Sequence, residues 1–334
     1  MSLRLAPALS GVEGVERANS SGAPALAAAS ARCIVFGYHE MGFACIEALL
    51  ELGAPIAALF THRDDPHEEI WWRSCAELAE RRGIPVHAPD GVDESWASKI
   101  AAMKPAVVYS FSYRYLIPES ILAIPPLGAY NLHPSMLPAY RGRAPINWML
   151  VNGEREGGVT LHRMVARADA GDIVAQRAIA IAEDDTALTL YRKLVPIGAE
   201  LVTEMHPRIV AGTAPRRTMD LSRGSYFGRR RPEDGRIDWN CPARQIYNLV
   251  RAVTHPYPGA FCFVAGKKLF VWEAQVAVAS GKLGAPGAMI AERAGGAIEV
   301  AAGAGSAIVK RVQFEGDAEA SPRETLGDGK FTFE

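Results

Sequence analysis

The chain has 334 residues, of which 49% are hydrophobic and 22% are charged, and its formal net charge is −1. This composition is typical of a globular protein with one large or two medium domains. A chain so close to neutral has no overall electrostatic reason to bind nucleic acid, although a local basic patch stays open. No apolar run approaches the ~20 residues that cross a bilayer, so we expect neither a nucleic-acid partner nor a membrane partner.

The cysteines and histidines argue against disulfides and metal. The cysteines are dispersed, odd in number and without a CxxC pair: Cys33, Cys45, Cys75, Cys241 and Cys262. This pattern indicates a reducing compartment, and we expect a cytoplasmic protein. The eight histidines show no HExxH or comparable spacing, so no metal cofactor is expected.

Residues 1–31 are rich in alanine, serine and glycine and end in APALAAASA. Such small residues also precede the cleavage site of a secretory signal. A signal needs an unbroken apolar centre, however, and Pro7, Gly11 and Glu13 interrupt it here. The composition favours a disordered leader or a misassigned start over a signal peptide.

Apolar strands alternate with helices from Arg32 to Phe111. The expected strands are Cys33–Phe36, PIAALF, a short extended IPVHAP and Ala106–Phe111, and the expected helices are FACIEALLELG, Trp71–Arg82 and WASKIAAM. Trp71 and Trp72 are interpreted as helix packing rather than as a stacking platform. Strands that are apolar throughout predict a parallel sheet covered on both faces.

The next stretch continues this α/β pattern. A strand begins at Ala129 and is stopped by Pro134, and a helix follows with Pro145 in its first turn, where the missing N–H costs little. GVTLHRMV and DIVAQRAIAI alternate as strands do, and Thr186–Val210 is a long helix. We therefore expect a Rossmann-like domain with a mostly parallel sheet over residues 32–212.

The composition changes after Gly212. Residues 213–235 are polar and rich in arginine and glycine, which predicts a linker. Residues 236–334 contain one helix, Ala243–Val253, and four β-type runs: GAFCFV, KLFVWEA, AIEVAA and AIVKRVQF. Strands without intervening helices predict a small open β-barrel of the OB-like kind as a C-terminal domain.

Asn131 and His133 are the first candidates for chemistry. They lie two residues apart at the end of a predicted strand, so both side chains share one face, and Pro134 keeps His133 extended. Ligands of open α/β sheets bind at the carboxyl ends of the strands, where an amide and an imidazole could stabilise an oxyanion and move a proton. An ordinary strand-end histidine beside a turn-forming asparagine is the simpler alternative.

The turn RADAGDIV supplies two carboxylates, Asp169 and Asp172. One of them could orient His133 and raise its pKa. Aspartates also commonly build turns through bonds to the backbone, and without other information this second interpretation is favoured.

Two arginine-rich segments are candidate anion sites. Arg141 and Arg143 flank Gly142 just before the helix of Pro145, where they would attract an anion or lie in a solvated loop. The run RRR at 229–231 is most often a solvated loop, with phosphate contact as the alternative.

The run AYNLHPSMLPAYRGRAPINWMLVNGE, followed by GVTLHRMVARADAGDIVAQ, resembles the folate-dependent formyltransferase family. The likeness extends from about residue 32 to about residue 314. NxHPSxLP with a later DxG is far more specific to the family than either piece alone. Within the family, the chain resembles the formyltransferase half of the bifunctional enzyme that formylates UDP-4-amino-4-deoxy-L-arabinose. The decarboxylase half of that enzyme has no counterpart here, and that enzyme has glycine where this chain has Pro134.

The resemblance implies roles for single residues. His133 matches the catalytic acid/base, Asn131 the amide that stabilises the oxyanion, and Asp169 the carboxylate that tunes the histidine. The segments that hold the donor, 10-formyltetrahydrofolate, match Tyr115, Leu116 and Ile117, Arg143, and Val165, Ala166, Arg167 and Ala168.

The resemblance also implies a small-molecule acceptor. We expect the amine of a nucleotide-linked amino sugar, most closely UDP-4-amino-4-deoxy-L-arabinose, in a pathway of lipid A modification. Methionyl-tRNA is the rival acceptor, but the acidic stretch HRDDPHEE lies where that enzyme carries a basic loop and would repel phosphates. Other nucleotide-linked amino sugars stay open as acceptors. Two other functions also stay open, a non-catalytic binding protein and a hydrolase that releases formate, as does assembly into a homo-oligomer.

Overall fold

The computed structural model describes residues 31–66, 68–277 and 284–334. The leader predicted for residues 1–31 lies outside the described residues except for Ala31. Within the described part of the chain, no helix combines the length and the apolar character needed to cross a membrane.

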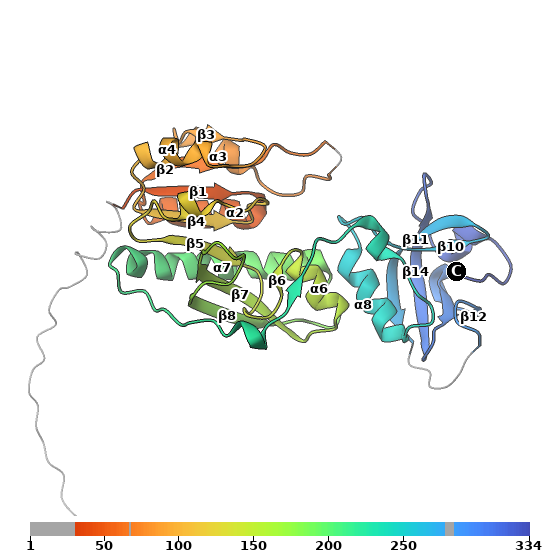
Figure 1. Ribbon diagram of the computed structural model, residues 1–334. Coiled ribbons are helices and arrows are strands. Elements are labelled where there is room, and N and C mark those ends of the chain that lie inside the picture. Colours follow the sequence, from red (N-terminus) through yellow and green to blue (C-terminus); the bar gives the residue numbers. More distant parts are fainter. Residues whose placement is uncertain (1–30, 67, 278–283) are drawn as a thin grey trace, which may run out of the picture.

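A seven-stranded sheet forms the N-terminal half, in the order β3-β2-β1-β4-β5-β7-β8 (Figure 1). The strands are β1 (Cys33–Gly37), β2 (Ile56–Phe60), β3 (Val86–His87), β4 (Val107–Phe111), β5 (Ala129–His133), β7 (Glu156–Arg163) and β8 (Ile173–Ala180). The first five in chain order pair parallel, β7 pairs antiparallel with β5, and β8 pairs antiparallel with β7. The predicted Rossmann-like, mostly parallel sheet is therefore confirmed.

Helices cover both faces because the strand residues alternate between two cores. Cys33 and Val35 join one core with α2 (His39–Glu51), α3 (Cys75–Arg81) and α7 (Ala187–Val210). Ile34 and Phe36 join the other core with α4 (Ser95–Ala102) and α5 (Glu119–Leu122). Ala129 belongs to the second core and Leu132 to the first, so Asn131 and His133 share the face of α4 and α5.

Two predicted helices begin elsewhere. Helix α2 begins at His39 rather than at Phe43. Helix α3 begins only at Cys75, because the Ser74 hydroxyl caps it by accepting from the Glu77 N–H. The helix predicted to contain Trp71 and Trp72 therefore begins after them, although Trp71 packs against Tyr191 of α7 as expected of helix packing. The ring of Trp72 lies over the imidazole of His39 at 3.8 Å between centroids.

The C-terminal half is a five-stranded antiparallel sheet in the order β10-β11-β14-β13-β12. The strands are β10 (Ala260–Val264), β11 (Lys267–Val276), β12 (Met289–Glu292), β13 (Ile298–Ala301) and β14 (Ser306–Phe314). This half also contains the helices α8 (Ala243–Val253) and α9 (Pro322–Leu326) and the short 3₁₀ turn η3 (Ala294–Gly296). The prediction missed β12 and α9. Phe331–Glu334 bridge the two edge strands: Glu334 exchanges two backbone bonds with Phe263, and Met289 N–H donates to Phe331 O. This bridging makes the sheet a barrel.

The segment predicted as a linker is bound to the N-terminal half. It contains η1 (Leu221–Arg223), β9 (Tyr226–Phe227) and η2 (Pro232–Gly235), and β9 pairs parallel with β6 (Arg141–Gly142). Helix α8 packs against α6 (Pro145–Val151) and β11, and so joins the two halves (Figure 1).

We expect Phe333→Ala to lower the free energy of unfolding by about 3–5 kcal/mol, because the buried ring leaves a cavity. Phe333 is 2% exposed and packs against Trp239, and its N–H donates to Gly287 O. Guanidinium unfolding measures the change. Leu116→Ala, at a side chain 72% exposed, serves as the control and should change stability by no more than about 0.5 kcal/mol. Equal losses in both variants would contradict the closure of the barrel by this segment.

Candidate active site

The carboxyl end of β5 carries Asn131 and His133 in a largely buried setting. Asn131 is half-buried and lies opposite His162 of β7 in the strand pairing. His133 is 5% exposed and lies opposite Thr160. The position follows from the sequence, because Pro134 ends the strand directly after the imidazole.

Asp169 reaches these side chains from the loop between β7 and β8. Its Oδ1 lies 3.6 Å from His133 Nδ1 and 3.4 Å from Asn131 Nδ2, and its Oδ2 accepts from the Gly142 N–H at 2.9 Å. The backbone of Asp169 adopts the left-handed region with φ 49°. Asp172, the other candidate, turns away and pairs with Arg216 at 3.3 Å. The structure thus brings together the three predicted catalytic residues.

The imidazole of His133 has a defined hydrogen-bonding pattern. Nε2 lies 2.8 Å from the carbonyl oxygen of Tyr140, and since a carbonyl only accepts, Nε2 carries the proton. In the neutral ring, Nδ1 is then unprotonated and faces the carboxylate of Asp169. This arrangement leaves Nδ1 as the nitrogen that can take up a proton.

Burial decides the charge of His133. Burial lowers the pKa of the imidazole below its ordinary value, and the opposing effects of Asp169 and the Tyr140 carbonyl are smaller. Asp169 raises the pKa of His133, as expected, but burial lowers it by more. Burial opposes ionisation of Asp169 too, but His133, His162 and the Gly142 N–H hold its pKa well below the usual range. Burial thus favours the neutral imidazole, and when the ring is charged its attraction to Asp169 favours the ionised carboxylate.

His162 is a member of the cluster that the sequence interpretation missed. It is 1% exposed, and its Nδ1–H donates to Arg163 O at 2.9 Å. Its Nε2 lies 3.2 Å from Asn131 Nδ2 and 3.4 Å from Asp169 Oδ1, so it bridges the amide and the carboxylate. Only the register of β7 against β5 points to it, and that register cannot be read from the spacing of the residues.

The segments predicted to hold the donor converge beside this cluster. Tyr115 and Leu116 are 46% and 72% exposed, and Ile117 packs against the second core, as does Met164. Arg143 is exposed and donates to Arg114 O at 3.2 Å, next to this segment.

The segment that precedes Asp169 forms a second exposed surface. Val165 is 44% exposed, Ala166 and Arg167 are exposed, and Ala168 is half-buried. Three of the five exposed large apolar side chains of the described residues, Tyr115, Leu116 and Val165, thus lie in these two segments.

The predicted arginine sites divide into exposed and buried members. Arg141 is only 5% exposed, and its Nε and Nη1 have no hydrogen-bond partner among the described residues. Arg229 and Arg231 are exposed, as expected for a solvated loop. Arg230 is instead half-buried and covers the ring of Trp148 at 4.6 Å.

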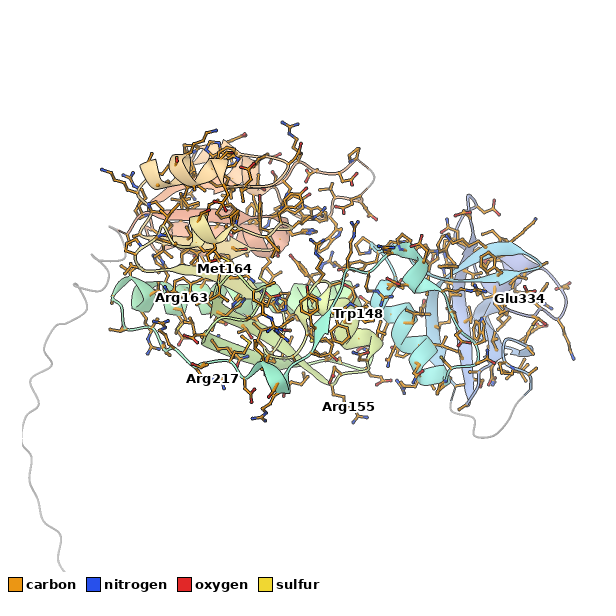
Figure 2. The ribbon with its side chains drawn as sticks, viewed as in Figure 1. Trp148, Arg155, Arg163, Met164, Arg217 and Glu334 are labelled. Atoms are coloured by element: carbon orange, nitrogen blue, oxygen red, sulfur yellow. The ribbon has the colours of Figure 1, made fainter. Side chains whose placement is uncertain are left out.

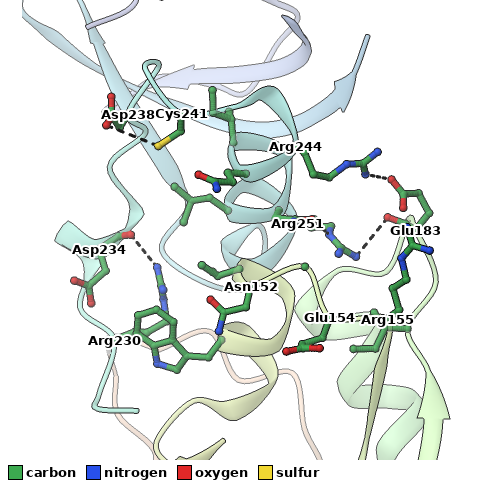
Figure 3. A pocket seen from close by; sticks show the side chains of 18 of the residues that line it. Asn152, Glu154, Arg155, Glu183, Arg230, Asp234, Asp238, Cys241, Arg244 and Arg251 are labelled. Atoms are coloured by element: carbon green, nitrogen blue, oxygen red, sulfur yellow. Dashed lines mark hydrogen bonds and ion pairs between the residues drawn. The ribbon is translucent and has the colours of Figure 1, made fainter. Parts of the chain in front are cut away.

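A pocket of about 870 Å³ lies where the two halves meet (Figure 3). Its charged lining residues are Glu154, Arg155, Glu183, Arg230, Asp234, Arg236, Asp238, Arg244 and Arg251. Tyr140 lies between this pocket and His133. Its hydroxyl donates to Glu154 and accepts from Asn152, while its carbonyl oxygen accepts from His133. Within the described residues, no group of three or more His, Cys, Asp and Glu side chains could hold a metal ion.

Solved structures share this architecture. HypX from Aquifex aeolicus, in complex with tetrahydrofolic acid, matches with a TM-score of 0.60 and 18% identity over 89% of this chain and 47% of that chain, so this chain spans about half the length of HypX. WlaRD, a sugar 3N-formyl transferase in the presence of dTDP and 5-N-formyl-THF, matches with a TM-score of 0.63 and 19% identity over 86% and 98% of the two chains. The N-formyltransferase from Helicobacter canadensis, in complex with folinic acid and dTDP-3-aminofucose, matches with a TM-score of 0.66 and 20% identity over 83% and 98%. At these identities the likeness shows the fold.

Two family models match the sequence itself. The formyl transferase model covers residues 33–205, and the model of the formyl transferase C-terminal domain covers residues 230–328. The first match alone spans more than half of the 334 residues and contains Asn131, His133 and Asp169. The chain therefore belongs to the formyl transferase family, the folate-dependent formyltransferases.

Proposed function

We propose that the protein transfers a formyl group from 10-formyltetrahydrofolate to the amine of a nucleotide-linked amino sugar, with UDP-4-amino-4-deoxy-L-arabinose as the preferred acceptor. The observation that carries this proposal is the convergence of Asn131, His133 and Asp169 at the end of β5, beside exposed apolar segments. The choice of this acceptor rests on the sequence resemblance to the enzyme that formylates this sugar.

His133 acts as the base in this reaction. The acceptor nitrogen forms a bond to the formyl carbon, the carbonyl electron pair moves to its oxygen, and Nδ1 of the neutral imidazole takes the proton from the attacking nitrogen. The resulting imidazolium faces Asp169 Oδ1 and is stabilised by that charge. The electron pair on the oxygen then re-forms the carbonyl, the carbon–nitrogen bond to the folate breaks, and His133 gives its proton to the departing folate nitrogen.

Asn131 must release an existing hydrogen bond before its amide can donate to the oxyanion. Its Nδ2 hydrogens point to His162 Nε2 at 3.2 Å and to Asp169 Oδ1 at 3.4 Å. Both contacts are long, so they are weak hydrogen bonds. Donation to the oxyanion requires Asn131 to give up one of them, and exchanging a weak bond for a charge-assisted one is favourable.

The donor fits the two exposed segments. Tyr115, Leu116 and Val165 offer apolar surface to a flat pterin, and Arg143 lies beside them as a cation for the carboxylates of the folate tail. The printed ligands of three similar structures are tetrahydrofolic acid, 5-N-formyl-THF and folinic acid, which supports the same donor class here.

The pocket between the two halves supports an anionic, nucleotide-sized acceptor. About 870 Å³ lies within the usual range for small-molecule sites. Arg244 is paired with Glu183, whereas Arg155, Arg230 and Arg236 form no ion pair with a carboxylate in the described part of the chain. Their charge would attract a diphosphate.

We expect His133→Ala and Asp169→Asn to lower turnover by about 10²–10⁴-fold, because each removes part of the proton-transfer pair. The measurement is formyl transfer from 10-formyltetrahydrofolate, with circular dichroism to verify folding. Asp172→Asn is the matched control, since this carboxylate pairs with Arg216 outside the cluster. Near-normal turnover in either of the first two variants would refute the assignment.

The charge state of the base can be tested without substrate. Because burial lowers the pKa of His133, its ring should be mostly neutral, in the Nε2–H pattern, at about pH 6.5, where an ordinary histidine is half charged. The unfolded chain binds this proton and the native state does not, so stability declines as pH falls through ~6.5. Imidazole ¹⁵N resonances, assigned with His133→Gln, give the answer; half-protonation at or above pH 6.5 would contradict it.

The acceptor is identified by incubating the protein and 10-formyltetrahydrofolate with a panel. The panel contains UDP-4-amino-4-deoxy-L-arabinose, thymidine-diphosphate amino sugars and methionyl-tRNA, and mass spectrometry shows which compound gains a formyl group. We expect the UDP sugar to be formylated fastest. Formylation of methionyl-tRNA alone would overturn the proposed acceptor, and release of formate without any acceptor would identify a hydrolase.

A further inference from the structure

Tyr140–Gly142 hold both members of the proton-transfer pair by their backbone. The carbonyl oxygen of Tyr140 accepts from His133 Nε2 at 2.8 Å, and the N–H of Gly142 donates to Asp169 Oδ2 at 2.9 Å. The distance between imidazole and carboxylate therefore depends on where these three residues lie. Strand β5 and the loop of Asp169 do not determine it alone.

The segment Gly224–Gly228 lies against these residues along its length. The Ser225 hydroxyl accepts from the Tyr140 N–H at 2.9 Å, and the Ser225 carbonyl oxygen accepts from the Arg141 N–H at 3.0 Å. The carbonyl oxygen of Phe227 accepts from the Arg143 N–H at 3.0 Å. Three of the four N–H groups from Tyr140 to Arg143 are thus bound by a segment that comes more than 80 residues later.

The ring of Phe227 adds a stack of side chains to these backbone bonds. It lies 5.0 Å from the ring of Tyr140 at 10° and 5.0 Å from the ring of Trp148 at 29°. Trp148 donates its indole N–H to Gly228 O, and Arg230 covers its other side at 4.6 Å. Trp148 lies at the junction of the two halves (Figure 2). The stack therefore ties Tyr140 to the segment that leads into the barrel.

The two segments approach too closely for side chains at two positions. A Cβ at Gly142, whose φ is +96°, would lie 2.2 Å from the carbonyl oxygen of Phe227. A Cβ at Gly224 would lie 2.3 Å from the carbonyl oxygen of Pro138. Only glycine permits the two backbones to approach this closely, so the position of Gly224–Gly228 against Tyr140–Gly142 depends on both glycines.

We propose that Phe227, seated by Ser225, is a positioning residue for the His133–Asp169 pair. It touches neither side chain and acts through Tyr140, whose ring it holds and whose carbonyl oxygen binds the imidazole. The segment between the two halves thereby takes part in catalysis without supplying a reacting group. The positioning itself is a property of the ligand-free protein, and only its effect on rate rests on the proposed function.

The experiment compares three variants of the full chain. Phe227→Ala removes the stacked ring, Phe227→Tyr keeps it, and Phe314→Ala removes a half-buried ring of the barrel that lies outside the site. The first readout is the imidazole ¹⁵N pattern of His133 without ligand. The second is kcat and KM for formyl transfer from 10-formyltetrahydrofolate to UDP-4-amino-4-deoxy-L-arabinose.

We expect Phe227→Ala to change the His133 resonances and to lower kcat on the order of 10²-fold with little change in KM, because small displacements of reacting groups are costly. Phe227→Tyr should restore both readouts, and Phe314→Ala should alter neither. Unchanged His133 resonances in Phe227→Ala would overturn the proposal, as would a rise in KM alone. If the sugar is not a substrate of the parent protein, the proposed function fails while the resonances still decide the positioning.

Discussion

The burial of one imidazole governs the rest of this site. His133 is almost inaccessible to water, so its charged form is disfavoured and both of its nitrogens need partners of the right kind. The Tyr140 carbonyl can only accept, which places the ring proton on Nε2. Nδ1 lies 3.6 Å from Asp169 Oδ1, and that carboxylate becomes its partner only when the ring is protonated. Asp169, Asn131 and His162 form the polar cluster beside this buried ring.

Burial and the charge of Asp169 shift the pKa of His133 in opposite directions, and the sequence alone does not show which effect is larger. A carboxylate beside a histidine suggests a raised pKa, yet here desolvation outweighs the charge of Asp169. The carboxylate then contributes most when the ring gains a proton during turnover, because the ion pair exists only in that state. A buried neutral base with a charged neighbour is suited to transient protonation.

Much of the fold could be predicted, because it depends on local patterns. Alternation along the strands, Pro134 after His133 and glycines after helices are properties of short windows of sequence. Other features depend on contacts between distant segments. His162 lies beside Asn131 only because of the register between β5 and β7. Asp169 lies in the site because its own backbone is left-handed and the Gly142 N–H donates to its carboxylate. Residues 213–235 have the composition of a linker, and nothing in that composition predicts the Phe227 stack.

The bridging of the barrel by Phe331–Glu334 has a consequence for self-association. This segment satisfies backbone groups on β10 and β12 simultaneously, through Phe263 and Met289. Detaching it would free the hydrogen-bonding edges of two strands in one event, and free edges are templates for pairing with other molecules. Four residues thus separate a sheet with both edges covered from one that can recruit a neighbour at either edge.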